Sequence, residues 1–199
     1  MSSVKLLGNL PRGLFFVISA PAGTGKTTLS NMLQSEFDCV VRSVSYTTRP
    51  KRANEVNGID YHFVDEKTFQ QMIGNDEFLE YAKVFNYYYG TSKEYVENML
   101  SVGKHVLLVI DTQGAMQVRD NKIPATLIFI KPPNFEELKN RLKKRNTEST
   151  QVLELRLSKA EEEMNTAVFY DYEITNDDLK IAYEKLRSIL ITEECEIKQ

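Results

Sequence analysis

The chain has 199 residues, of which 42 % are hydrophobic and 27 % charged, and this composition excludes an intrinsically disordered protein. Its length accommodates one domain with a substantial core and small insertions rather than two full domains. The formal net charge of −3 argues against general nucleic-acid binding, and the lack of a long apolar run or a signal peptide predicts a cytoplasmic protein without membrane contact.

An apolar run followed by a glycine-bearing turn is the first pattern along the chain. Residues 14–19, LFFVIS, are β-forming without polar alternation, as expected of a strand buried on both faces. The turn SAPAGTGKTT, residues 19–28, leads into a helical pattern at 26–37. Strand, glycine turn and helix in this order are typical of a phosphate-binding P-loop, and the alternative is a fortuitous strand–turn–helix.

The predicted P-loop would bind a nucleotide mainly through its backbone. Its glycines let N–H groups turn inward around phosphate oxygens, and the helix N-terminus adds partial positive charge. Lys26 supplies a full charge to the β and γ phosphates, and Thr27 offers a hydroxyl to Mg²⁺. Ala20 replaces the usual first glycine, which is tolerable where φ is not positive. The residues that we expect to contact ATP here are Ala22, Gly23, Thr24, Gly25, Lys26, Thr27 and Thr28.

Residues 45–92 interrupt the regular alternation of strands and helices. They contain a short helical pattern at 66–73 between aromatic-rich, alternating segments at 59–64, 78–85 and 86–92. We therefore predict a small mixed α/β insertion.

Two further apolar runs, HVLLVID at 105–111 and ATLIFI at 125–130, resemble the first strand. Three such buried strands predict a parallel sheet. Asp111 would lie at the carboxyl end of its strand, beside the P-loop, where α/β proteins bind ligands. We interpret Asp111 as a carboxylate linked to the metal ion, and the alternative is an Asp that only caps the following helix.

The last third of the chain continues the β–α alternation. Helical patterns at 134–145 and 151–164 flank a polar stretch, RNTEST, at 145–150, which we interpret as a short mobile lid. A strand at 170–175 and a helix at about 177–191 complete the chain. Right-handed crossovers between these elements predict a three-layer α/β fold.

Arginines occur beside the insertion and the predicted lid. Charged helix faces are usually only solvated, and we keep that interpretation for the lysines of residues 139–144. Forked guanidinium groups, however, bind phosphate oxygens bidentately and stabilise the charge of a phosphoryl-transfer transition state. We therefore assign catalytic roles to Lys26 and to four arginines, namely Arg49, Arg141, Arg145 and Arg156.

The chain resembles the guanylate kinase family over nearly its whole length, through ordered segments such as SAPAGTGKTT, SVSYTTRPKR, NGIDYHFV, FLEYAKVF, IDTQGA and YDYEITNDDL. The resemblance implies a P-loop nucleoside-monophosphate kinase that transfers phosphate from ATP to GMP or dGMP with Mg²⁺, in purine metabolism. It also implies a core of residues 1–44 and 93–199, a GMP-binding insertion at 45–92, and a lid at about 141–156.

The resemblance further implies roles for single residues. It places the GMP phosphate at Arg49, Arg52, Tyr61 and Tyr89, the guanine at Ser45, Glu80, Thr91 and Asp111, and the adenine region at Asn176. The two oxygens of Glu80 could accept hydrogen bonds from the N1–H and N2–H₂ groups of guanine, whereas adenine would leave the carboxylate unpaired. From its segment alone, Glu80 could equally be a surface residue of an alternating strand.

Some features depart from the family pattern. Val109 stands where the family usually has an acidic residue, and RPKR shifts a proline by one position. His62 and His105 match no catalytic position, so we expect structural roles for them.

Alternative functions are a non-enzymatic guanylate-kinase-like protein-binding module, a kinase for another monophosphate, or a P-loop hydrolase. The sequence leaves the oligomeric state open.

Overall fold

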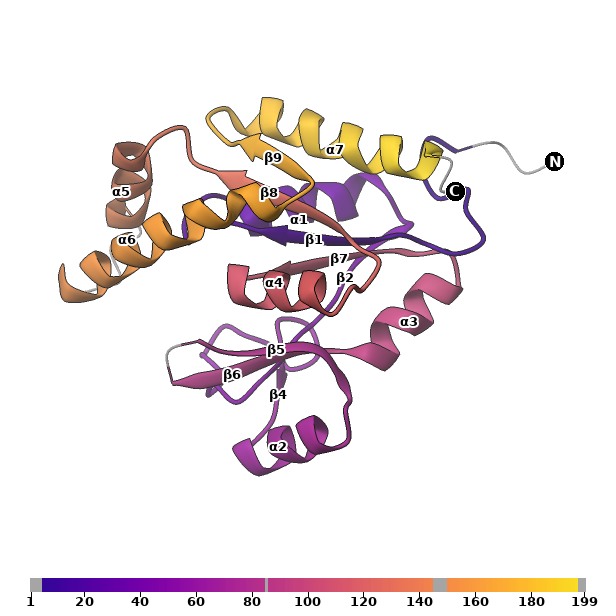
Figure 1. Ribbon diagram of the computed structural model, residues 1–199, viewed down its shortest axis with the longest axis horizontal. Helices are drawn as coiled ribbons and strands as arrows, with labels where there is room; N and C mark the ends of the chain where they lie inside the picture. Colours follow the sequence, from indigo (N-terminus) through magenta and orange to yellow (C-terminus); the bar gives the residue numbers. More distant parts are fainter. Residues whose placement is uncertain (1–4, 85, 145–149, 197–199) are drawn as a thin grey trace.

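A five-stranded parallel sheet lies at the centre of the computed structural model, which describes residues 5–84, 86–144 and 150–196 (Figure 1). The side chains of residues 144 and 150–156 fall outside this description. Among the described residues, none of the helices is long and apolar enough to cross a membrane.

The central sheet has the strand order β2-β7-β1-β8-β9, and all neighbours are parallel. In chain order its strands are β1 (Phe15–Ser19), β2 (Val40–Arg42), β7 (His105–Ile110), β8 (Thr126–Lys131) and β9 (Tyr172–Thr175). In the central strand β1, Ile18 lies opposite Val109 on one side and Ile128 on the other. This arrangement confirms the predicted α/β class with a parallel sheet.

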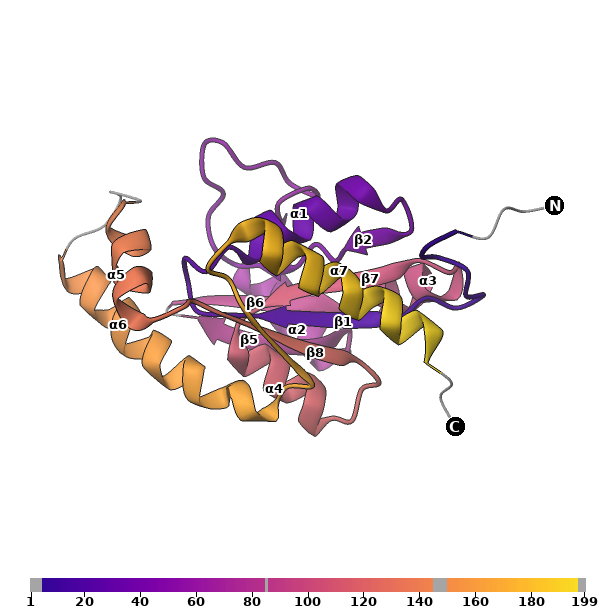
Figure 2. The same cartoon turned by 90° about the horizontal axis from the view of Figure 1, so that it is seen from above.

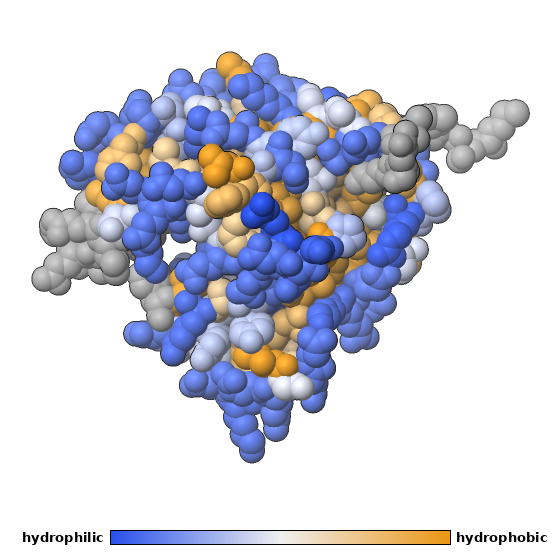
Figure 3. Space-filling view, viewed as in Figure 1, coloured by the Kyte–Doolittle hydropathy of each residue, from blue (hydrophilic) through white to orange (hydrophobic). Residues whose placement is uncertain are grey.

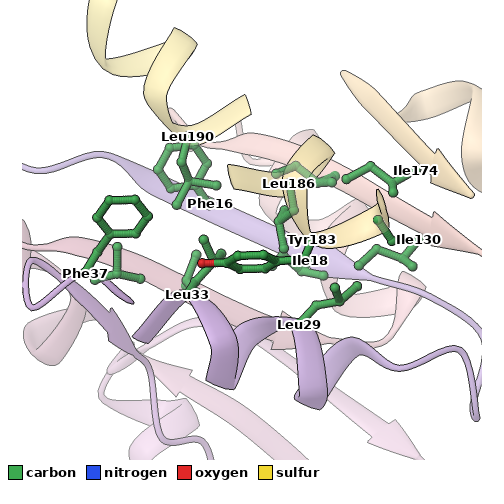
Figure 4. Close-up of a cluster of buried hydrophobic side chains, with 14 of the residues drawn as sticks. Phe16, Ile18, Leu29, Leu33, Phe37, Ile130, Ile174, Tyr183, Leu186 and Leu190 are labelled. Carbon is green, nitrogen blue, oxygen red and sulfur yellow. The ribbon is translucent and has the colours of Figure 1, made fainter. Parts of the chain in front are cut away.

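Helices cover both faces of the central sheet, with α1 (Lys26–Glu36) and α7 (Leu179–Cys195) packed on one face and α3 (Lys93–Ser101) and α4 (Thr112–Asp120) on the other. Figure 2 shows α1 and α4 on opposite sides of the sheet. The side chains of β1 alternate between these two layers. Phe16 and Ile18 pack with α1 and α7 (Figure 4), whereas Phe15 and Val17 pack with α3 and α4. Because both faces are covered, every residue of β1 is buried, which explains its unbroken apolar sequence.

A second, four-stranded sheet has the order β4-β3-β6-β5. Its strands are β3 (Tyr46–Thr47), β4 (His62–Phe63), β5 (Phe78–Val84) and β6 (Tyr87–Ser92), and helix α2 (Glu66–Gly74) packs on it. The β3–β4 pair is parallel and the others are antiparallel. The ring of Phe69 in α2 stacks 4.6 Å from that of Phe78 and 5.4 Å from that of Tyr88, between ring centroids.

Three further elements extend from the central sheet, namely α5 (Phe135–Lys144), α6 (Thr150–Asn165) and the 3₁₀ helix η1 (Thr166–Phe169). Helices α5 and α6 pack together through Leu138, Leu142 and Ala160. The Asn134 side chain caps α5 by accepting from the Glu137 N–H at 2.8 Å. Residues 145–149 of the predicted lid lie outside the described residues.

The observed elements differ from the predicted ones in several places. Helices α3 and η1 were not predicted, and β9 begins at Tyr172 rather than at residue 170. Strand β2 is three residues long, and such a short segment carries no period by which sequence analysis could have recognised it. The predicted strand at 59–64 shortens to the two residues of β4. A turn replaces its beginning, because the Asp60 carboxylate accepts from the Val56 N–H at 2.7 Å and Gly58 adopts a φ of 81°.

The surface on the face shown in Figure 3 is mostly hydrophilic, with small separate groups of hydrophobic side chains.

His105 lies at the start of β7, at the end of the strand away from Asp111. Its Nδ1 accepts from the Leu14 N–H at 3.0 Å, and its Nε2 lies 2.7 Å from a Glu194 carboxylate oxygen. His105 is therefore structural, as predicted.

Candidate active site

A cleft of about 590 Å³ lies between the central sheet, the second sheet and α6. The P-loop contributes Lys26, the second sheet contributes Glu80, and the end of β7 contributes Asp111. Helix α6 lines the cleft through side chains that include Glu163. Residues that are distant in the sequence therefore share one cavity at the carboxyl ends of the parallel strands, where α/β proteins bind ligands.

The P-loop has the backbone geometry of an anion site. Gly23 and Gly25 have φ angles of 89° and 95°, a region that favours glycine. Gly25 occupies the N-cap position of α1, so no side chain caps the N–H groups of the first turn. This turn also contains no acidic residue. The N–H groups of that turn and the positive end of the helix dipole are therefore available to an anion. Ala20 is buried and is not among the described residues with positive φ, so its methyl group is tolerated.

The loop is held in place by neighbouring polar groups. The buried Asn176 side chain donates to the Thr24 carbonyl at 2.6 Å, and a Cβ on Gly25 would lie 2.7 Å from the same amide nitrogen. The Lys26 ammonium group donates to the carbonyl of Ala20, at the start of the loop. Asn176 thus braces the P-loop, while its predicted adenine contact stays a prediction.

Glu80 is a buried carboxylate in the wall of the cleft. Its side chain accepts a hydrogen bond at 2.6 Å from the hydroxyl of Thr91, the residue opposite it on β6. The alternative of a surface-facing Glu is wrong, because Glu80 is only 4 % exposed. Burial raises its pKa to about 7, with a smaller contribution from Asp111, while the Thr91 hydrogen bond acts in the opposite direction.

Asp111 combines a structural contact with a place in the cleft. One of its carboxylate oxygens accepts from the Gly114 N–H at 3.0 Å and so caps α4. The helix cap is therefore present, but Asp111 also lines the cleft, so the metal role of Asp111 and Thr27 stays a prediction. Within residues 5–84, 86–144 and 150–196, no group of three or more His, Cys, Asp or Glu side chains could hold a metal ion.

Arg49 lies in an aromatic and acidic cluster beside the cleft. Its guanidinium group forms a bidentate pair with Glu55, with distances of 2.6 and 3.0 Å, and lies 5.4 Å from the ring centroid of Tyr61. The ring of Tyr61 is 5.8 Å from that of Tyr89. The Glu55 carboxylate also accepts from the backbone N–H of Arg52, whose own side chain is exposed. The hydrogen bond from Arg49 lowers the pKa of Glu55.

Of the four arginines predicted to be catalytic, the structure describes the side chains of Arg49 and Arg141. Arg141 donates to the Asn176 carbonyl at 2.9 Å and pairs with Glu137 at 2.8 Å, so it connects α5 to the strand end beside the P-loop. Arg145 lies outside the described residues. The backbone of Arg156 belongs to α6, but its side chain is also outside the description.

Sequence analysis missed several residues of the site. Glu55 anchors Arg49, and Gly114 leaves space for Glu80. Helix α6 contributes Lys159 and Glu163, and η1 contributes Thr166, its first residue; their spacing of four and three residues places them on one helical face. This spacing is the pattern by which the sequence could have identified these residues as neighbours. Burial raises the pKa of Glu163 to about 6, while nearby Lys26 lowers it.

Known proteins resemble this chain over most of its length. The family model described as guanylate kinase matches residues 13–193. A guanylate kinase of Protochlamydia amoebophila is 55 % identical over 186 residues, covering 94 % of each chain. One from Neisseria meningitidis is 47 % identical, covering 94 % of this chain and 91 % of the relative. The crystal structure of guanylate kinase from Anaplasma phagocytophilum superposes with a TM-score of 0.77 at 33 % identity, covering 96 % of this chain and 90 % of that one.

Proposed function

Because the chain belongs to the guanylate kinase family, we propose that its cleft holds ATP on the P-loop and GMP or dGMP at Glu80 during phosphoryl transfer. Guanylate kinases are nucleoside-monophosphate kinases, which transfer a phosphoryl group from ATP to GMP. The observation that supports this assignment most is the buried Glu80 in the same cleft as Lys26. The following roles are proposals for this chain.

The donor phosphates bind at the P-loop in this proposal. The backbone N–H groups of residues 22–28 surround the phosphate oxygens, and Lys26 turns from the Ala20 carbonyl toward the β and γ phosphates. Asn176 keeps the loop in shape and borders the adenine region.

A magnesium ion is compatible with the residues at this site. Mg²⁺ usually keeps several waters and binds one or two protein oxygens together with substrate phosphates, so it does not need a cage of carboxylates. The exposed hydroxyl of Thr27 and the carboxylate of Asp111 would hold it. When bound, the ion neutralises charge on the phosphate oxygens.

The GMP phosphate binds at the cluster around Arg49, with Arg52, Tyr61 and Tyr89. A guanidinium group has two edges that can each pair with two oxygens. Glu55 occupies the edge formed by the two terminal nitrogens, so the phosphate would use the edge that includes Nε. Glu55 therefore serves as a positioning residue for Arg49.

The guanine base binds at Glu80 in this proposal, with Ser45, Thr91 and Asp111 around it. Thr91 fixes one carboxylate oxygen, and both oxygens remain able to accept from guanine, because a carboxylate has about four acceptor sites. An adenine base would leave the buried carboxylate unpaired, and such a loss discriminates between substrates by roughly 10⁴-fold.

Catalysis then depends on positioning and on charge neutralisation. Phosphoryl transfer in line between two bound substrates needs no covalent enzyme intermediate. We assign acceptor binding to residues 45–92, donor binding to the core of 1–44 and 93–199, and closure to the lid at about 141–156. Closure would exclude water and bring Arg141, Arg145 and Arg156 to the phosphates.

An acceptor assay tests the proposed function. Purified protein receives ATP and Mg²⁺ with GMP, AMP, UMP or no acceptor, and ADP production is measured. Of these acceptors, we expect only GMP to give rapid ADP formation. A rate without acceptor that equals the rate with GMP would indicate a hydrolase, equal use of AMP would contradict the guanine assignment, and no ADP under any condition would indicate a protein-binding module.

Glu80→Gln tests the residue assignment within this function. The amide presents one acceptor and one donor group, so its NH₂ would face a guanine donor. We expect kcat/KM for GMP to fall by about 10²-fold or more while the KM for ATP changes little. An unchanged KM for GMP would reject the role of Glu80.

A further inference from the structure

Helix α4 contacts β5 directly beside Glu80. Strand β5 is the edge strand of the second sheet, so one row of its backbone groups lacks a neighbouring strand. The side-chain amide of Gln117 pairs with this edge, accepting from the Tyr81 N–H at 3.2 Å and donating to the Tyr81 carbonyl at 2.7 Å. The backbone next to Glu80 is therefore fixed against α4.

Gly114 lies three residues before Gln117, on the same face of α4. A Cβ atom on Gly114 would lie 2.5 Å from Oε2 of Glu80 and 3.1 Å from its carboxyl carbon. The backbone does not require glycine here, because Gly114 has no positive φ, and alanine is the better residue inside a helix. The physical reason for glycine at this position is therefore the space that it leaves for the Glu80 carboxylate.

We propose that Gly114 is a positioning residue for guanine recognition, which acts by letting the Glu80 carboxylate rest directly on α4. This inference rests on the proposed role of Glu80. An added Cβ at position 114 would overlap Oε2 of Glu80 at 2.5 Å more severely than Cδ1 of Ile110 at 3.0 Å. With the Gln117 clamp holding the strand, the carboxylate would therefore make the larger shift. Ordinary contact would need a shift of about 1 Å, and a displacement of that size can cost about 10²-fold in rate.

Gly114→Ala provides the test, with Gly74→Ala as the matched control. Gly74 is the last residue of α2, and an added Cβ there would meet no atom within 4 Å. We would measure kcat/KM for GMP and for IMP, whose base lacks the N2 amino group, and KM for ATP. We expect G114A to lower kcat/KM for GMP by about 10- to 100-fold and to weaken the preference for GMP over IMP, with KM for ATP within about twofold.

A double-mutant cycle separates this role from a general effect on packing. A Glu80→Ala background removes the most severe overlap of the added methyl group and leaves the milder one with Cδ1 of Ile110, at 3.0 Å. G114A should therefore change kcat/KM for GMP by less than about twofold in that background. G74A should resemble the wild type. Wild-type GMP and IMP kinetics in G114A, or an equal loss in both backgrounds, would overturn the proposal.

Three further outcomes also decide between these explanations. Should G114A fail to fold, circular dichroism and thermal melts of the G114A/E80A double variant decide the matter, because its folding would confirm the clash with Glu80 and its failure to fold would reject it. If E80A itself leaves GMP kinetics unchanged, the guanine assignment fails and this inference fails with it. If E80A weakens GMP use and G114A does not, only the inference about Gly114 is wrong.

Discussion

The proposed phosphate site and the proposed base site share one cleft but are built differently. The P-loop is a run of consecutive residues, and it offers mainly backbone N–H groups and the end of α1. The base site consists of side chains, with Ser45 before β3, Glu80 on β5 and Thr91 on β6. A backbone site tolerates a change of side chain, such as alanine at position 20, whereas the side-chain site depends on one buried carboxylate.

The two sites also differ in their effect on stability. The P-loop uses dipoles that are fixed by the fold, so it buries no carboxylate. Glu80 is withdrawn from water, and its raised pKa of about 7 measures how strongly burial disfavours its charged form. The selectivity that we propose for the base site therefore comes at a cost in folding free energy.

Removal of the charge at the phosphate site should give the largest effect. We expect Lys26→Ala to lower kcat by about 10³-fold, because the loss of one preorganised charge contact in a transition state costs about that much. Lys139→Ala on α5, a partly exposed residue, is the control and should retain wild-type activity. A K26A rate within tenfold of wild type would show that the backbone alone supports catalysis.

Glu80→Gln should stabilise the fold at high pH. The pKa of Glu80 is 4.5 as a free group and about 7 in the folded protein, so its cost to stability grows as pH rises between these values and is constant above them. At pH 8 we expect E80Q to raise the free energy of unfolding by about 3 kcal/mol, at about 1.4 kcal/mol per pKa unit. Urea denaturation at pH 8 and pH 5 checks this, and a gain of equal size at both pH values would refute it.

GMP binding should weaken as pH falls below about 7. Protonated Glu80 loses acceptor capacity toward guanine, so KM for GMP should rise by up to about tenfold per pH unit. Asp111 is the charged neighbour that adds to this shift. E80Q supplies the control, since GMP has a titrating phosphate of its own. Identical pH profiles for wild type and E80Q would exclude Glu80 as the titrating group.

Glu55→Gln should weaken GMP binding moderately. Without the full charge of its partner, Arg49 is oriented less strictly, and we expect KM for GMP to rise by about fivefold with little change in kcat. The control is Glu97→Gln, which alters a similar bidentate pair with Arg12 that is more than half exposed. Equal effects of E55Q and E97Q would reject a positioning role.

Ala20→Gly should have the smallest effect. Because Ala20 does not have positive φ, glycine relieves no strain, and we expect kcat to stay within about twofold of the wild type. Steady-state kinetics with saturating ATP and GMP provide the measurement. A tenfold increase in kcat would show that the methyl group of Ala20 distorts the P-loop.

The same contrast explains what the sequence could predict. The P-loop was predictable because its residues are consecutive and follow a buried strand. The burial of Glu80 did not follow from its own segment, because an alternating strand has two faces and only packing decides which one is covered. Gly114 depends on a contact between separate segments, and Glu55 pairs with Arg49 within an irregular loop, so no helix or strand period marks either residue.

A structure with bound GMP tests the central claim most directly. We predict that both oxygens of Glu80 lie about 3 Å from N1 and N2 of guanine, with Thr91 still donating to the carboxylate. A structure in which GMP is bound but Glu80 points away from the base, or in which another residue accepts from N1 and N2, would contradict this account.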